Sequence, residues 1–284
     1  MPRVLLLTAL PTPDPDETAA RVAPLLRERG HGVRISCIDD LGLDAEGPCL
    51  TGGPALRREH DLLWVLGFGR AATFLDKMQL LAAAGVPLVN GVEALLLLHG
   101  KYPPPALAPF MPETHASTRS EALVDHACRA GGRWVLKPPA GSFGRGVTIG
   151  EGRDPAFVAA ARALTRGDRY ALLQRHVAGE EHRVLVADGE IVGAYARIGP
   201  GTGDGAANLA LGGDARPART DALRDARARE IASVLTPFGV RFAGLDLVGD
   251  TLLEANIVNP GGLGTLARLG DPDATARLVA ALFA

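Results

Sequence analysis

Lysine is rare in this chain, and one of its lysines stands at the start of a glycine-rich segment. The 284 residues include 30 Lys and Arg, of which only Lys77, Lys101 and Lys137 are lysines. Lys137 ends the apolar run that begins at Trp134, and AGSFGRG follows at residues 140–146. Glycines let main-chain N–H groups approach anionic oxygens, and an ammonium offsets their charge. The pattern indicates a phosphate-binding loop; the alternative is an ordinary glycine turn beside a core strand.

The order of lysine and glycines separates this pattern from other nucleotide sites. A protein kinase has its glycine loop before the lysine, and a Walker A loop contains GK[ST]. Here the lysine precedes the glycines and no GK[ST] follows. Gly67, Gly69 and Ala72 have GxGxxA spacing, but not at the first strand-to-helix turn, and Asn90 rather than an acid ends the next strand. This argues against dinucleotide binding.

A second group of chemistry-bearing residues lies near the C-terminus. Gly-Asp at residues 249–250 predicts a hairpin turn. Glu254 and Asn256 then share one strand face, and Asp246 can lie opposite them on the partner strand. Carboxylate and amide oxygens suit Mg²⁺, or Mn²⁺, better than zinc. We predict a metal site at Asp246, Glu254 and Asn256; the alternative is a solvated hairpin face.

The elements that position these residues are predicted from apolar periodicity. Short apolar runs alternate with helical patterns over residues 1–100, which predicts an N-terminal parallel α/β domain. The runs lie at residues 3–9, 33–38, 62–66 and 86–90. Five prolines between residues 103 and 112 then exclude helix and central strand, so they mark a boundary.

Two further regions follow that boundary. Residues 101–177 read as a small lobe of mixed helices and strands. Residues 178–284 begin with a hairpin that turns at Asp188-Gly189, contain the metal hairpin and end in a helix. The predicted class is therefore α/β, with α+β character in the later lobes.

Composition excludes several partners. A net charge of -2 and 5% aromatic residues provide neither a basic field nor stacking platforms, so we expect no nucleic-acid partner. No apolar run approaches the roughly 18 residues of a membrane span, and the short N-terminal run lacks a convincing cleavage site. Three dispersed cysteines fit a reducing, cytoplasmic location.

Two expectations concern residues outside these motifs. Lys77, within FLDKMQLL, is expected to be a helix-surface charge. The histidines other than His176 show no metal-ligand spacing, so we expect them at the surface or in packing.

The motifs together resemble the ATP-grasp ligases, most closely bacterial glutathione synthetase. The matching segments are Lys101, VLKPPAGSFGRGV, LLQRHV, GEEHRVLVADGEIVGAYAR, NLALGG and GLDLVGDTLLEANIVNPGGL. They span residues 86–270, whereas the first lobe is similar only in architecture. The resemblance implies an ATP-grasp fold with a lid subdomain at 101–177 and a C-terminal metal- and substrate-binding subdomain at 178–284.

The resemblance also implies the activity. It is that of an ATP-dependent carboxylate–amine ligase, which phosphorylates a substrate carboxylate with Mg-ATP. An amine then attacks the acyl phosphate to form an amide, and ADP and phosphate are released. Positioning, metal charge and exclusion of water supply the rate, so no protein nucleophile is needed.

Roles for individual residues follow from the matched positions. Asp246, Glu254 and Asn256 would hold Mg²⁺. Charge developing near the transferred phosphate would be met by Lys137, Arg183 and Arg197. Residues expected to contact ATP are Lys101, Lys137, the loop residues Gly141, Ser142, Phe143, Gly144 and Gly146, and the adenine-facing hinge Gln174, Arg175, His176 and Val177. Residues expected near the substrate are Asn208, Gly261 and Gly262.

Some of these residues also have a simpler, structural interpretation. Lys101, next to a proline run, could be a solvated loop residue. His176 could contribute only its main chain to the hinge. Arg183 and Arg197 could serve partly as cross-strand charge partners.

The sequence departs from glutathione synthetases in two loops. Ala206 and Ala207 stand before NLALGG, where the family carries an arginine, and GFGRAATF replaces an arginine-containing element of the first lobe. Arg70 is a candidate replacement for the missing substrate arginine. Glutathione synthesis is therefore the first candidate, and a glutamate or dipeptide ligase is the alternative. A non-catalytic ATP-binding protein is disfavoured because five site residues are retained. We expect small amino-acid or peptide substrates and a homo-oligomer, either dimer or tetramer.

Overall fold

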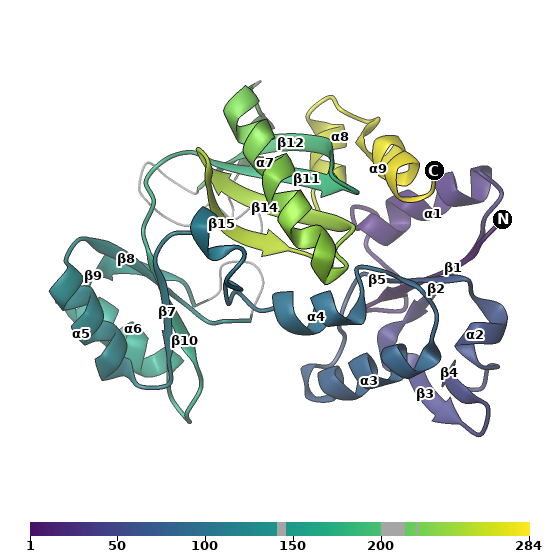
Figure 1. Cartoon of the computed structure of the whole chain (residues 1–284), viewed down its shortest axis with the longest axis horizontal. Coiled ribbons are helices and arrows are strands. Elements are labelled where there is room, and N and C mark those ends of the chain that lie inside the picture. Colours follow the sequence, from purple (N-terminus) through teal and green to yellow (C-terminus); the bar gives the residue numbers. More distant parts are fainter. Residues whose placement is uncertain (141–145, 200–213, 220) are drawn as a thin grey trace.

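The computed structural model describes residues 1–140, 146–199, 214–219 and 221–284. Figure 1 shows three larger sheets, each covered by helices. The N-terminal sheet and the sheet that contains β11, β14 and β15 lie together, and the small lobe that contains β7 to β10 projects to one side. The mixed helix and sheet content confirms the predicted α/β class.

The N-terminal lobe contains the predicted parallel sheet, in the order β2-β1-β5-β6. Residues Val4 to Leu7 of β1 are fully buried because alternate side chains enter two different cores on the two faces of the sheet. Its strands and helices are β1 Arg3–Thr8, α1 Thr18–Glu28, β2 Gly32–Cys37, α2 Leu56–Glu59, β5 Leu62–Val65, α3 Phe74–Ala84, β6 Leu88–Val89 and α4 Val92–Leu98.

A hairpin in this lobe was not predicted. It consists of β3 Leu41–Asp44 and β4 Gly47–Leu50. The side chain of Asp44 accepts hydrogen bonds from the main-chain N–H of Glu46 at 2.8 Å and of Gly47 at 3.2 Å. This local turn closes the hairpin without an apolar alternation that could have revealed it.

The small lobe is an antiparallel sheet in the order β7-β10-β8-β9, with α5 and α6 packed together beside it. Its own core contains Trp134, Leu136, Phe157 and Leu173. The mixture of helices and strands agrees with the prediction for this region, and β7 is an edge strand of four residues just after the prolines. The elements are β7 Thr114–Ser117, α5 Ser120–Ala130, β8 Arg133–Lys137, β9 Thr148–Glu151, α6 Pro155–Leu164 and β10 Ala171–Arg175.

The C-terminal lobe is an antiparallel sheet in the order β13-β12-β11-β14-β15. Both predicted hairpins are confirmed, because β11 pairs with β12 and β14 pairs with β15. The Asp188-Gly189 turn has φ of 44° and 85°, as a two-residue hairpin turn requires. The elements are β11 Glu181–Ala187, β12 Glu190–Ile198, β13 Asp214–Pro217, α7 Ala222–Leu235, β14 Phe242–Val248, β15 Thr251–Asn256, α8 Leu263–Arg268 and α9 Ala274–Leu282.

The N-terminal and C-terminal lobes share their hydrophobic cores. Leu5 of β1 belongs to the same buried cluster as Leu245 of β14, and Val4 belongs to the same cluster as Leu278 of α9. The small lobe has a separate cluster. The small lobe can therefore move without exposing the core that joins the other two lobes.

Asn90 links these two lobes through its buried side-chain amide. Its Nδ2 donates to the carbonyls of Phe242 and Ile257, and its Oδ1 accepts from the N–H of Arg241 at 2.7 Å and of Phe242 at 2.9 Å. Both ends of the amide are used, which matches the full hydrogen-bonding capacity of an asparagine. The residue has φ of 59°, a conformation that asparagine tolerates better than most residues.

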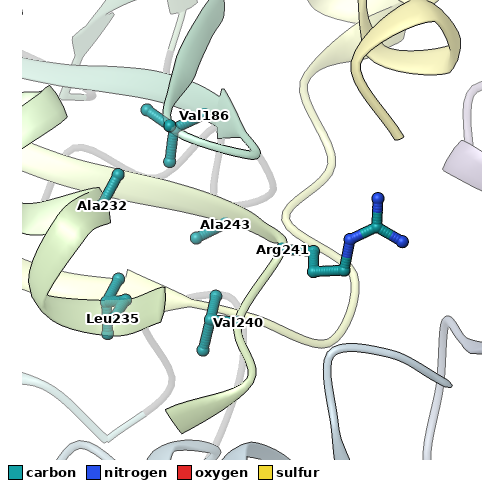
Figure 2. Close-up of a pocket in the computed structure, with 7 residues that line it drawn as sticks. Val186, Ala232, Leu235, Val240, Arg241 and Ala243 are labelled. Atoms are coloured by element: carbon teal, nitrogen blue, oxygen red, sulfur yellow. The ribbon is translucent and has the colours of Figure 1, made fainter. Parts of the chain in front are cut away.

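A small apolar cavity lies between α7 and the C-terminal sheet (Figure 2). Its volume is about 10 Å³. The guanidinium of Arg241 points away from it in Figure 2 and pairs with Asp188. Successive side chains of a strand point to opposite faces of the sheet. Arg183 stands three positions from Val186 on β11, and Asp246 stands three positions from Ala243 on β14, so both polar residues project from the face opposite the cavity. The cavity is a packing space, distinct from the site described below.

None of the helices in the described part of the chain is long and apolar enough to span a membrane.

Candidate active site

A buried ion pair occupies the centre of the C-terminal sheet. Arg183 of β11 is directly opposite Asp246 of β14, and each residue is about 5% exposed. Nε and Nη2 of Arg183 donate to the two carboxylate oxygens of Asp246, the latter at 2.8 Å, and Nη1 donates to the carbonyl of Pro260. This two-pronged geometry is the strongest form of an arginine–carboxylate pair.

Close packing explains how the guanidinium reaches that position. Gly244 lies beside Arg183, and a Cβ there would lie 3.0 Å from Cδ of Arg183 and 2.8 Å from Cβ of Pro260. Burial alone would raise the pKa of Asp246, but the charges of Arg183 and Arg197 outweigh it and lower that pKa. The carboxylate therefore stays ionised in spite of its burial.

Arg197 of β12 joins this pair to a second carboxylate. Its Nη1 donates to Glu181 at 2.6 Å and to Asp246 at 3.2 Å. Burial raises the pKa of Glu181 to about 7, and the charge of Asp246 adds to that effect. Nε of Arg197 is buried and has no hydrogen-bond partner in the described part of the chain. An unpaired buried N–H of a cation is a donor available to an anionic ligand.

Glu181 was not predicted as a site residue. It faces the same side of β11 as Arg183, two residues away, and it pairs with Arg197 in the sheet register. In the sequence, Glu181 is the second acid of Glu-Glu-His-Arg and stands two positions before Arg183, which was already assigned to the site. That spacing was the signal that could have identified it.

The predicted metal-binding residues are brought together on β14 and β15. Asp246 is opposite Glu254 in the sheet register, and Nδ2 of Asn256 lies 3.2 Å from Oδ2 of Asp246. The donor set of two carboxylates and an amide fits Mg²⁺ chemically. In the present arrangement the amide of Asn256 presents nitrogen to Asp246, so it would present its oxygen to a cation after a half-turn about its last bond.

Lys101 is held against this hairpin. Its Nζ lies 3.1 Å from Oε2 of Glu254, and its side chain is only 12% exposed. The N–H of Lys101 donates to the carbonyl of Pro139 at 2.8 Å, next to the glycine-rich segment. The geometry does not support a solvated loop residue at this position.

Lys137 lies on the small lobe, on the face opposite its helices. It is 6% exposed, and its Nζ donates to Oε1 of Gln174 at 2.8 Å. Nε2 of Gln174 in turn donates to Oγ1 of Thr114 at 3.1 Å. Burial lowers the pKa of Lys137 to about 8. The three side chains form a continuous polar row across β7, β10 and β8.

A match to a known protein family covers the part of the chain that carries these residues. Residues 101–271 match the family described as "Prokaryotic glutathione synthetase, ATP-grasp domain". The chain belongs to this family. The matched segment begins at Lys101 and contains the small lobe and the buried cluster of Arg183, Arg197 and Asp246.

Curated relatives in the family align with part of their own length. The glutathione synthetase of Prochlorococcus marinus (strain MIT 9313) is 31% identical over 196 residues, which are 68% of this chain and 63% of that protein. The glutathione synthetase of Shewanella oneidensis is 33% identical over 205 residues, which are 70% of this chain and 64% of that protein. The chain thus aligns with less than two thirds of the length of these relatives.

Solved structures confirm the ATP-grasp fold predicted from the motifs. D-cycloserine synthetase DcsG superposes with a TM-score of 0.71 at 19% identity, covering 97% of this chain and 99% of that one. A RimK domain ATP-grasp protein from Sphaerobacter thermophilus gives 0.68 at 19% identity, with 99% and 100% covered. D-alanine–D-alanine ligase from Bacillus anthracis, complexed with ATP, gives 0.67 at 14% identity, with 99% and 95% covered.

The hinge expected in this ATP-grasp family follows β10. The N–H of Arg175 donates to the carbonyl of Glu113 at 2.8 Å, and the N–H of His176 donates to that of Arg133 at 3.1 Å. The side chain of Arg175 lies over the ring of Trp134, in the core on the helix-bearing face of the sheet. Arg175 therefore directs its side chain away from Lys137.

Some of the other predicted site residues lie in the described part of the chain, and others do not. Gly146 has φ of 75°, and Gly261 has φ of 65°. Gly262 has φ of 90°, and a Cβ there would lie 2.9 Å from the ring of Tyr195, so only glycine fits. Those outside the described residues are Gly141, Ser142, Phe143, Gly144 and Asn208.

The prediction for Lys77 is wrong. This lysine is only 4% exposed, and its Nζ donates to the carbonyls of Phe68 at 2.6 Å and Arg70 at 3.0 Å and pairs with Asp39. The helical pattern placed Lys77 on α3, but the loop of residues 67–70 folds back over its ammonium. Its rarity was the signal that the sequence offered.

The buried ammonium of Lys77 holds the main chain of Arg70, while the side chain of Arg70 extends into solvent. Its side chain is 74% exposed, and its Nε lies 3.5 Å from Asp39. The N–H of Arg70 also donates to both oxygens of the Asp39 carboxylate at 3.1 Å. Arg70 is thus anchored through its main chain within the N-terminal lobe, apart from the buried cluster of the C-terminal sheet.

Proposed function

We propose that this chain is an ATP-dependent carboxylate–amine ligase. The γ-phosphate of ATP is transferred to a substrate carboxylate, which gives an acyl phosphate and ADP. The amine of a second substrate then forms a C–N bond at the acyl carbon, loses a proton and displaces phosphate. Membership of the glutathione synthetase ATP-grasp family supports this proposal.

The observation that most supports this proposal is the ion pair between Lys101 and Glu254. A lysine from the start of the family segment and a carboxylate from its last hairpin lie 3.1 Å apart although they are far apart in sequence. An ammonium beside a carboxylate that can bind a metal ion suits a phosphate chain, because the phosphate oxygens can then contact both the ammonium and the metal ion.

ATP would lie between the small lobe and the C-terminal sheet. Lys101 and Lys137 would contact its phosphates, and the glycine loop after Lys137 would cover them. The buried ammonium of Lys137 would exchange Gln174 for a phosphate oxygen. Main-chain groups of Val177 and its neighbours would read adenine, since the N–H groups of Arg175 and His176 are used in the sheet.

The two arginines would have different tasks. All three nitrogens of the Arg183 guanidinium are engaged by Asp246 and Pro260. Arg197 has a buried Nε without a partner in the described residues. We therefore assign the contact with the transferred phosphate to Arg197, and to Arg183 the positioning of Asp246.

Asp246, Glu254 and Asn256 fit Mg²⁺, or Mn²⁺, by their donor chemistry. When bound, such a cation would neutralise phosphate charge in the transfer. Asp246, Glu254 and Asn256 would hold the cation, and Lys101 beside Glu254 would contact the same phosphate chain. Gly261 and Gly262, which follow this hairpin, would border the substrate, together with Asn208.

A phosphate-release assay with defined substrate pairs tests the proposal. Release that requires a carboxylate and an amine together, and that stops after removal of divalent metal, is the expected result. Equal ADP formation without any amine would contradict ligation. No turnover on any tested pair, with ATP binding retained, would favour a non-catalytic ATP-binding protein.

Glutathione synthesis is our first candidate reaction, and γ-glutamylcysteine with glycine is the pair to test first. The relatives named glutathione synthetase support it. A different amino-acid or peptide substrate is the second candidate. Arg70 on the GFGRAATF loop favours the second, since it places an exposed cation in a lobe that the family match does not cover.

We also propose a cytoplasmic location and a homo-oligomer. The described helices include no membrane span. Size-exclusion chromatography with light scattering tests the assembly, and a monomer at micromolar concentration would contradict it.

A further inference from the structure

Three polar side chains meet at the outer edge of the small lobe, away from the row of Lys137. Nε2 of His115 and Nε2 of His126 lie 2.8 Å and 2.9 Å from the same oxygen, Oε1 of Glu113. The two imidazole rings have centroids 3.7 Å apart. Sequence spacing gave no sign of this group because the fold brings its members together from two elements.

The fold sets the direction of each side chain. Glu113 and His115 stand two residues apart at β7, so they share one face of the edge strand. His126 is in the middle of α5, which packs against that strand. Trp134 lies behind both rings, with centroid distances of 6.2 Å to His115 and 5.2 Å to His126. A rigid strand, a helix and a buried indole thus hold the group.

We propose that Glu113, His115 and His126 form a binding site for a zinc ion. Two imidazole nitrogens and one carboxylate oxygen are ligands that Zn²⁺ accepts, and a fourth position would be taken by water. The three ligand atoms lie within 4.8 Å of one another. Ligand atoms of a tetrahedral zinc site are about 3.3 Å apart, so small side-chain movements would complete the geometry.

The surroundings orient the carboxylate. Nη2 of Arg175 lies 3.9 Å from Oε2 of Glu113, while Nη1 donates to the carbonyl of Gly131 at 2.6 Å. The guanidinium also lies over the ring of Trp134, 4.2 Å from its centre. Arg175 is therefore fixed on one carboxylate oxygen and leaves Oε1 directed at the two histidines. Outer contacts of this kind tune metal ligands.

The site differs in chemistry from the proposed magnesium site. Asp246, Glu254 and Asn256 would offer only oxygen donors beside three cationic side chains, whereas this site offers nitrogen. Imidazole ligands favour late first-row metals such as zinc over magnesium. All three side chains are partly exposed, which allows the ion to enter from solvent.

A bound zinc ion would connect β7 to α5. Thr114 stands between Glu113 and His115 in sequence and directs its side chain to the other face, where it accepts the hydrogen bond from Gln174. The ion would thereby fix the edge strand that supports the polar row of Lys137. Such an ion would brace the small lobe by joining these two elements.

Metal titration of the full chain tests this inference. Untagged protein would be stripped with a chelator and titrated with Zn²⁺ against a chromophoric zinc indicator, in the presence of excess Mg²⁺. We expect one equivalent bound with a dissociation constant of about 10 μM or lower. His115→Ala or His126→Ala should weaken binding at least about tenfold, and the stripped variants should retain wild-type circular dichroism.

Two control variants separate this site from others. Glu254→Gln alters the proposed magnesium site, and His99→Ala removes a histidine outside the group; both should keep the wild-type zinc affinity. Co²⁺ in place of Zn²⁺ should give visible absorption bands that His126→Ala removes. Weak wild-type binding, affinity unchanged in both histidine variants, or loss of binding in Glu254→Gln would overturn the inference.

Discussion

The ammonium of Lys137 and the side-chain oxygen of Gln174 are 2.8 Å apart on neighbouring strands of the small lobe. This hydrogen bond holds a buried cation in a lobe that offers it no carboxylate partner at contact distance among the described residues. A charge kept under these conditions is destabilised by burial, as its lowered pKa of about 8 indicates. An incoming phosphate would relieve that cost.

Replacement of Lys137 by methionine should reduce kcat/KM for ATP at least about a hundredfold, because a charge that meets the transition state is removed. Steady-state kinetics with the phosphate-release assay provide the measurement. Arg34→Met, which removes an exposed cation of another lobe, is the control and should retain the wild-type activity. Wild-type turnover in Lys137→Met would rule out its assigned role.

The pH dependence should report both Glu181 and Lys137. Below pH 7 Glu181 gains a proton and no longer neutralises Arg197, and above pH 8 Lys137 loses its charge. A plot of kcat/KM against pH should therefore fall on both sides of about pH 7.5. Glu181→Gln should remove the acid limb, and an unaltered limb would show that another group titrates there.

Glu181 should also affect stability with a defined sign. Its pKa is raised from 4.5 to about 7 on folding, so between these values the folded chain binds more protons than the unfolded chain. The contribution of this group to stability therefore falls as pH rises from 4.5 to 7. Urea unfolding at several pH values should show a flatter dependence in Glu181→Gln than in the wild type.

Breaking the Arg183 pair should be costly for folding. Arg183→Met leaves the Asp246 carboxylate buried with less compensation, so the free energy of unfolding should fall by about 3–5 kcal/mol. Arg34→Met removes an exposed pair with Glu59 at 3.4 Å and should cost less than about 1 kcal/mol. Chemical denaturation measures both. Similar small losses in the two variants would show that the buried pair carries little stability.

Arg70 provides a test of substrate binding. Arg70→Ala should raise KM for the carboxylate substrate about tenfold with little change in kcat, since an exposed cation contributes mainly to ground-state binding. KM for ATP should stay the same. Arg58→Ala, which removes another exposed arginine of the same lobe, is the control. If Arg70→Ala has wild-type kinetics on every accepted substrate, the first lobe binds its ligand through other residues.

The sequence predicted the elements that carry strong periodicity and the residues that lie in ordered motifs. The β14–β15 hairpin was predicted from its Gly-Asp turn, but it is a register shift between Asp246 and Leu247 that sets Asp246 opposite Glu254. The short strand β7 could not be predicted, because four residues after a proline run have no useful period and gain their strand conformation by pairing with β10.

Side-chain environments were harder to predict than positions. Lys77 has the pattern of a helix-surface residue, and only the folded loop of residues 67–70 explains its burial. Glu181 is one acid in a charged stretch until the sheet register sets it beside Arg197. His115 and His126 are eleven residues apart in sequence and meet only because α5 packs on β7. Each depends on tertiary contacts that local patterns do not encode.

The core shared by the first and last lobes has a consequence for how this chain can be divided. The family segment begins at residue 101, yet Leu245 belongs to the same buried cluster as Leu5 of β1, in the first ten residues. An excised fragment of residues 101–271 would leave Leu245 facing water, together with the two main-chain carbonyls that Asn90 satisfies. The segment that matches the family is therefore not an autonomous folding unit, and homologues can exchange first lobes only when they preserve this apolar seam.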